Sequence, residues 1–177
     1  MERQYKNLVL SAFFIALGII LPFITMQIPR IGNMLLPMHI PVILCGFICG
    51  GPYGLIVGLS VPLLRSVLTG MPLMIPAAVS MAPELAIYGL VTGLLYKKLK
   101  TSKFGIYISL ITAMILGRIV WGIVSALVFS LIGNSFTWKI FVANGFINAI
   151  PGIVIQLILI PVLVKRLEVT KEVSTSV

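Results

Sequence analysis

The residues of this sequence that could do chemistry are a few charged side chains inside long apolar runs. Glu84 is the acid in the apolar body of the chain, and Arg65 and Arg118 also lie within apolar stretches. An arginine guanidinium can hold a carboxylate through two parallel hydrogen bonds. Either arginine can therefore pair with Glu84, which leaves the other for an acidic solute, and the sequence leaves open which arginine does which.

Three further polar residues are expected at a similar depth. His39 begins the second apolar segment, and Asn144 and Asn148 are four residues apart, so they share one helix face. Because a charge near the bilayer centre costs about 2.5 to 3.5 kcal/mol, these groups should face the bundle interior or a wet cavity. A purely structural alternative is an ion pair with interhelical hydrogen bonds from the asparagines, and a polar cap at His39. We predict six substrate-binding residues: His39, Arg65, Glu84, Arg118, Asn144 and Asn148.

The sequence has no motif of an enzyme. HExxH, GxSxG and paired carboxylates are missing, and so is the GxxxxGK[ST] sequence of a nucleotide-binding loop. If the chain takes part in ATP-driven transport, the ATPase must be another subunit. Cys45 and Cys49 are spaced four apart with a single histidine in the chain, which favours helix packing over a metal site. We expect no catalytic residue, no metal and no cofactor.

The composition is that of an integral membrane protein. Of the 177 residues 59% are hydrophobic and 10% charged, and the mean hydropathy is +1.16. The glycine pairs Gly54/Gly58 and Gly89/Gly93 have the GxxxG spacing of close helix contacts. We predict an all-α bundle, one membrane domain over residues 1–168 and a disordered cytoplasmic tail over 169–177. Apolar length and Pro/Gly punctuation predict six transmembrane helices over residues 5–26, 37–50, 53–69, 76–98, 104–132 and 138–166.

The positions of the basic residues indicate how the chain is oriented in the membrane. With both termini inside, nine Lys and Arg residues lie on the cytoplasmic side and two, Arg30 and Lys139, lie outside. The side with more basic residues stays in the cytoplasm. We therefore predict a multi-pass protein of the cell membrane with both termini cytoplasmic, and the net charge of +9 gives no support to nucleic-acid binding.

Several stretches carry a family resemblance. Six short spans, with Ala12 and Ala16 as an AxxxA pair in SAFFIA, resemble the substrate-binding S-component of an energy-coupling factor (ECF) vitamin transporter. The resemblance runs from KNLVLSAFFIALGIILP to YGLVTGLLYKKL, and the series LPMHIPV, GPYG, PLLRS and GMP is similar to the pantothenate-type branch. It implies a small-molecule vitamin substrate captured from outside, and docking on a membrane coupling subunit driven by two cytoplasmic ATPases. Small residues four apart give Ala12 and Ala16 a physical reason to form the docking face, with internal packing as the alternative.

Two expectations concern how the substrate is held. Pantothenate is a small carboxylate whose hydroxyl and amide groups suit the two asparagines, although other acidic micronutrients fit the same residues. The loop from Gln27 to Leu36 is either an outer lid over the pocket or a plain connection.

The alternative function is a solitary proton-coupled carrier with Glu84 as the proton site.

Overall fold

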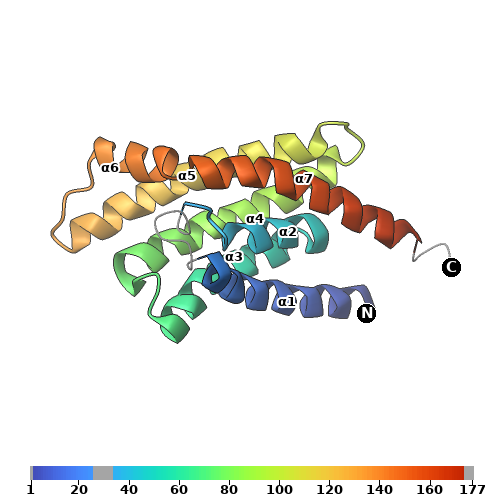
Figure 1. Cartoon of the computed structure of the whole chain (residues 1–177), viewed down its shortest axis with the longest axis horizontal. Helices are drawn as coiled ribbons and strands as arrows, with labels where there is room; N and C mark the ends of the chain where they lie inside the picture. The colour runs from blue at the N-terminus through green and yellow to red at the C-terminus, as the bar shows by residue number, and fades with distance from the viewer. Residues whose placement is uncertain (1, 26–33, 174–177) are drawn as a thin grey trace.

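The computed structural model describes residues 2–25 and 34–173, and within them it is built from helices alone. The predicted all-α class is therefore confirmed. The elements are α1 (Glu2–Thr25), α2 (His39–Cys49), α3 (Gly51–Thr69), η1 (Met74–Ala78), α4 (Val79–Leu99), α5 (Gly105–Leu131), α6 (Trp138–Val142), η2 (Ala143–Ile147) and α7 (Ile150–Val173) (Figure 1).

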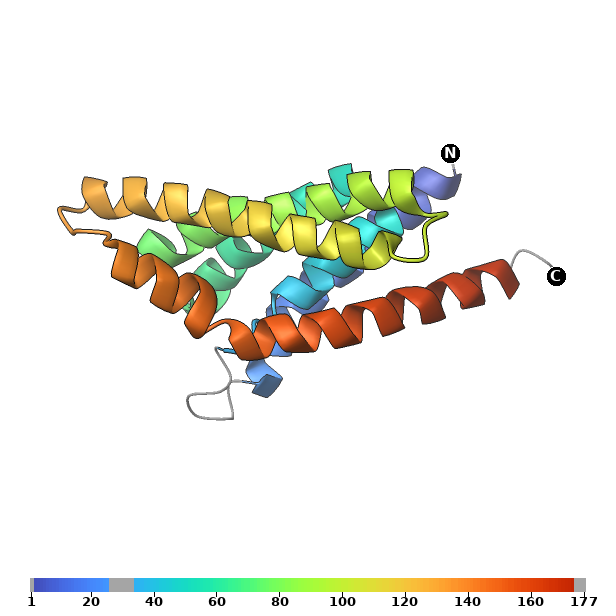
Figure 2. The same cartoon turned by 90° about the horizontal axis from the view of Figure 1, so that it is seen from above.

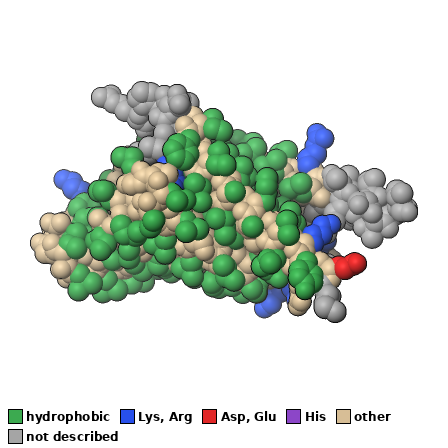
Figure 3. Space-filling model, turned by 90° about the horizontal axis from the view of Figure 1, so that it is seen from below, with side chains coloured by type: hydrophobic (Ala, Val, Ile, Leu, Met, Phe, Trp, Pro, Cys, Tyr) green, Lys and Arg blue, Asp and Glu red, His purple; other side chains and the backbone are tan. Residues whose placement is uncertain are grey.

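Within residues 2–25 and 34–173, five segments are long and apolar enough to cross a membrane: Gln4–Ile24, Gly51–Thr69, Met74–Leu99, Gly105–Leu131 and Trp138–Leu167. Large apolar side chains are exposed along these helices, as expected of surfaces that meet lipid. Figure 3 shows one such face, which is mostly hydrophobic, with basic side chains mainly toward its two ends.

The second predicted segment is a short helix at the centre of the bundle. α2 has 11 residues, Val42, Ile43 and Cys45 in it are fully buried, and it packs against α1, α3, α4 and α7 (Figure 1). A helix of this length rises about 16 Å, roughly half the hydrocarbon thickness of a bilayer. It begins at His39, two residues later than the predicted start at Pro37.

The third and fourth helices approach each other through glycine, as their spacing predicts. A methyl group added at Gly54 would overlap the backbone of Gly89, and one added at Gly58 would overlap the backbone of Leu85. Backbones at this separation leave no room for a Cβ atom. The contact fixes α3 against α4, and these two helices carry Arg65 and Glu84.

The sixth predicted segment, 138–166, is not one helix. It consists of α6, η2 and α7, with the break at Asn148 and Ala149 (Figure 2). Pro151 is the second residue of α7, just after this break. It has no backbone N–H to donate to the preceding turn, and its ring obstructs that turn. At the other end α7 continues to Val173, so the predicted boundary at residue 168 lies inside the helix, and residues 174–177 lie outside the described part.

The two ends of the bundle differ in which chain ends and connections they hold. The start of α1, the end of α7 and the α4–α5 connection lie at one end, and the α5–α6 connection lies at the other (Figures 1 and 2). The first end carries Lys97, Lys98, Lys100 and Lys103. By the excess of basic residues this end is expected in the cytoplasm, which stays a prediction.

Candidate functional site

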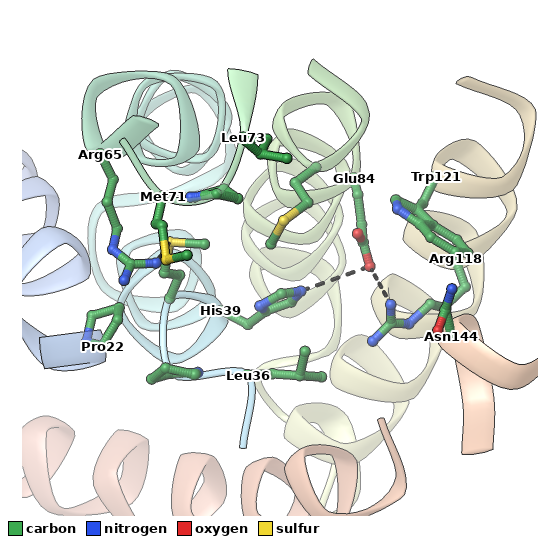
Figure 4. A pocket seen from close by; sticks show the side chains of 14 residues that line it. Pro22, Leu36, His39, Arg65, Met71, Leu73, Glu84, Arg118, Trp121 and Asn144 are labelled. Carbon is green, nitrogen blue, oxygen red and sulfur yellow. Dashed lines mark hydrogen bonds and ion pairs between the residues drawn. The ribbon is translucent and has the colours of Figure 1, made fainter. Parts of the chain in front are cut away.

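A cavity of about 340 Å³ lies beyond the N-terminal end of α2. This volume is in the range of small-molecule sites. Its lining comes from α1, the residues just before α2 and the first residue of α2, and from α3, the α3–η1 connection, α4, α5 and η2 (Figure 4). Five lining residues are polar or charged, namely His39, Arg65, Glu84, Arg118 and Asn144, and nine are apolar, namely Pro22, Leu36, Pro37, Met38, Met71, Pro72, Leu73, Met81 and Trp121.

Glu84 pairs with Arg118. Nη1 of Arg118 lies 2.9 Å from Oε1 of Glu84, and the two side chains are 7% and 1% exposed. The hydroxyl of Tyr88 donates to the same oxygen over 3.1 Å. The packing of α4 on α5 sets this pair, because a methyl group at Gly117 would overlap the Tyr88 ring. The question that the sequence left open, which arginine meets Glu84, is thus answered by the helix contact.

His39 is buried beside this pair. Its side chain is 1% exposed, and Nε2 lies 3.7 Å from Oε1 of Glu84, too far for a hydrogen bond. The ring is tilted at 55° to Tyr88, with centroids 5.4 Å apart. His39 is therefore part of the polar cluster at the cavity, which differs from the exposed cap considered as an alternative.

Several polar atoms of this cluster lack protein partners. Nε and Nη2 of Arg118 and both ring nitrogens of His39 are buried without a hydrogen-bond partner within the described residues. A buried donor or acceptor left unmade costs about 1 to 3 kcal/mol, more for a charged group. His39 and Arg118 both line the cavity, so these atoms lie beside it, although each is itself covered by the surrounding protein.

Arg65 lies on the opposite side of the cavity from Glu84 and Arg118 (Figure 4). It is 6% exposed. Nη1 donates to Sδ of Met38 over 3.6 Å, and Cζ lies 5.9 Å from the centroid of the Phe23 ring. A thioether and an aromatic face are weak acceptors compared with a carboxylate.

The two asparagines occupy different positions relative to the cavity. Asn144, on η2, is part of the lining, and Asn148 is not among the lining residues. The side-chain nitrogen of Asn148 donates to Oδ1 of Asn144 over 3.1 Å, and both are exposed. They meet across one turn, as their spacing indicates, although the helix breaks after η2. Through this contact Asn148 acts on the orientation of Asn144.

Two groups of site residues were missed by sequence reasoning. Tyr88 binds Glu84, and its position one turn further along α4 was a usable signal. Met38, Met71 and Met81 line the cavity, but methionine in an apolar run is typical of any membrane helix and gave no signal.

The predicted docking residues are not part of the cavity lining, and the predicted lid is described only in part. Of the loop Gln27–Leu36, residues 27–33 lie outside the described part, and Leu36 lines the cavity. Ala12 and Ala16 are exposed on the outer side of α1, while Ser11 and Phe14 face the core. The described residues contain no group of three His, Cys, Asp or Glu side chains that could hold a metal ion.

One comparison with known proteins gave a match. The family model described as "ECF transporter, substrate-specific component" matches residues 6–164, which span the chain from α1 into α7 and include every described residue of the polar cluster. Comparisons with curated proteins and with solved structures gave no match.

Proposed function

Because the chain belongs to the family of substrate-specific components of ECF transporters, we propose that it captures a small carboxylate such as pantothenate from outside the cell. Members of this family are substrate-binding membrane subunits and are not themselves the ATPases. We further propose that the loaded chain docks on a membrane coupling subunit, which is driven by two cytoplasmic ATPases.

The cavity is the main observation in support of this proposed function. It is lined mainly by helices of a membrane bundle, and its described lining contains two guanidinium groups and one carboxylate. A substrate carboxylate brings the charges of this lining closer to balance, and a guanidinium fork suits a carboxylate geometrically. The side chains of His39 and Arg118 also line the cavity and give it further polar surface for a ligand.

The docking face is proposed on α1. Ala12 and Ala16 are exposed and four residues apart, so a partner helix can approach the α1 backbone there. The neighbouring Val9, Phe13 and Ile20 are 69%, 57% and 55% exposed, which adds apolar area on the same helix.

The first test is purification of the tagged chain from its native membrane. A coupling subunit and ATPases should copurify, and calorimetry on the isolated chain should detect pantothenate binding. Ala12→Trp and Ala16→Trp should abolish copurification and uptake while leaving binding unchanged. Ala126→Trp, at an exposed alanine of α5, is the matched control and should retain all three.

A solitary carrier would behave differently. Uptake by the purified chain in ATP-free liposomes under a proton gradient would support a proton-coupled carrier using Glu84 and would refute the subunit function. The geometry argues against that carrier, since protonation of Glu84 would break its 2.9 Å ion pair and strand the buried Arg118.

A further inference from the structure

The charged groups of the cavity are divided between two ends. Figure 4 shows Arg65 on one side and Glu84, Arg118 and Asn144 on the other, with His39 reaching toward Glu84. From this division we infer that the substrate lies across the cavity, with its carboxylate at Arg65 and an uncharged hydroxyl or amide group at the His39–Glu84–Arg118 cluster. This orientation rests on the proposed function, the binding of a small carboxylate, and assigns each end of the site a separate role in specificity.

We place the substrate carboxylate at Arg65 because Arg118 is already paired with Glu84. Arg118 contacts Glu84 over 2.9 Å, so a second carboxylate at Arg118 would lie close to the negative charge of Glu84. Like charges this close disfavour each other strongly in a low dielectric. Among the described lining residues Glu84 is the acid, and it lies across the cavity from Arg65, so a substrate carboxylate at Arg65 meets a guanidinium away from that negative charge (Figure 4).

The far end of the substrate should be uncharged. A substrate ammonium would need a carboxylate, and that of Glu84 is shared with Arg118 and Tyr88. A neutral His39 has one donor and one acceptor nitrogen, while Nε and Nη2 of Arg118 are donors. Both side chains line the cavity, so a group that both donates and accepts, such as a hydroxyl or an amide, suits this end of it.

The rest of the described lining is apolar. Leu36, Met71, Leu73 and Met81 contribute to it, and flexible methionine side chains adapt to an irregular aliphatic shape. The substrate class is therefore a short acid with an aliphatic body and a hydroxyl or amide group at the far end, which excludes cations and amino-acid zwitterions.

The test compares three ligands by calorimetry on the full chain purified in detergent. They are pantothenate, pantothenol, which has an alcohol in place of the acid, and the dideoxy analogue of pantothenate, in which both hydroxyl groups are replaced by hydrogen. The wild-type chain should prefer pantothenate over pantothenol by roughly 30-fold or more, since the alcohol cannot make the charged two-bond contact with the guanidinium of Arg65. It should also prefer pantothenate over the dideoxy analogue, by roughly 10-fold.

The two ends are separated by two variants with opposite effects. Arg65→Gln should bring the pantothenate/pantothenol ratio close to one and leave the preference for hydroxyl groups intact. His39→Phe keeps a ring beside Tyr88 and should reduce the preference for hydroxyl groups while leaving the acid/alcohol ratio intact. Arg65→Lys serves if Arg65→Gln does not fold, and should lower the acid/alcohol ratio because it keeps the charge but loses the fork.

Failure of the orientation is distinguishable from failure of the proposed function. If pantothenate binds but Arg65→Gln or Arg65→Lys keeps the full acid/alcohol ratio, the orientation is wrong and the carboxylate is held elsewhere. If the wild-type chain binds pantothenate and pantothenol equally, carboxylate recognition itself is wrong. If it binds none of the three ligands, both the substrate and its orientation are refuted, while the docking prediction on α1 is judged by copurification alone.

Discussion

Removing the charge of Arg118 should destabilise the bundle far more than removing an exposed lysine. At 2.9 Å and an effective dielectric constant of about 20, the attraction between Arg118 and Glu84 is roughly 6 kcal/mol before desolvation is subtracted. Removing one partner of a buried pair typically costs about 3 to 5 kcal/mol, because the other charge stays buried and alone. We expect a loss of this size for Arg118→Gln and for Glu84→Gln.

The assay is thermal unfolding in detergent, followed by the helical circular dichroism signal. For a chain of this size 1 kcal/mol corresponds to roughly 2 to 4 °C, so each single variant should lower Tm by roughly 6 to 20 °C. The control is Lys139→Gln, which removes a positive charge at an exposed position and should change stability by no more than about 0.5 kcal/mol.

The double variant tests the pairing itself. Glu84→Gln/Arg118→Gln removes both charges, so no buried charge is left without its partner. The double variant should therefore be at least as stable as the more stable of the two single variants. Losses that add up across the two substitutions would show no coupling between the side chains. That result would refute the ion pair as the interaction that holds the cluster together.

Three further predictions concern topology and packing. In a cysteine-free background, Ser102→Cys should react only with reagent from the cytoplasmic side and Ser135→Cys only with outside reagent; the reverse pattern would overturn the predicted orientation. Gly89→Ala should destabilise the bundle by about 1 to 3 kcal/mol in the same unfolding assay because its methyl group overlaps the α3 backbone, and an unchanged Tm would contradict that close contact. Tyr88→Phe removes the hydroxyl that binds Glu84 and should cost about 1.5 to 3 kcal/mol, less than Arg118→Gln; an equal loss would mean that ring packing has changed as well.

The helices could be predicted because lipid imposes a simple rule on sequence. A span needs a long apolar run, and the runs here are separated by Pro, Gly and charged residues, so the predicted segments match the helices closely for 53–69 and 104–132. The contact between Gly54 and Gly89 was also visible, because glycine at this spacing has few other uses in a membrane helix.

The break in the sixth segment could not be predicted from proline alone. Pro62, Pro83 and Pro161 lie inside continuous helices, whereas the chain breaks just before Pro151. Neighbouring helices can satisfy the backbone groups that a proline releases, and this depends on contacts that one sequence does not display. The same break places Asn144 at the cavity wall, so this part of the site also depended on tertiary structure.

The charged residues of the site could be predicted from the sequence, but which of them pair with each other could not. Charged residues within apolar segments are few, which identified Arg65, Glu84 and Arg118. Both arginines were compatible with Glu84 by depth. The choice between them follows from the packing of α4 on α5, where Gly117 makes room for Tyr88.

The position of the cavity follows from the length of α2. At 11 residues this central helix fills only about half the thickness of the bilayer, and the chain before it, from Leu36 to Met38, lines the cavity. The longer helices α3, α4 and α5 continue past the start of α2 and carry Arg65, Glu84 and Arg118 into the space beyond it. Had α2 been of full length, apolar side chains would occupy this space, and the three charges would have to be buried in contact with them at high cost. The short central helix and the charged residues of its neighbours therefore depend on each other: the space that α2 leaves open is where a polar cavity can form within a membrane bundle.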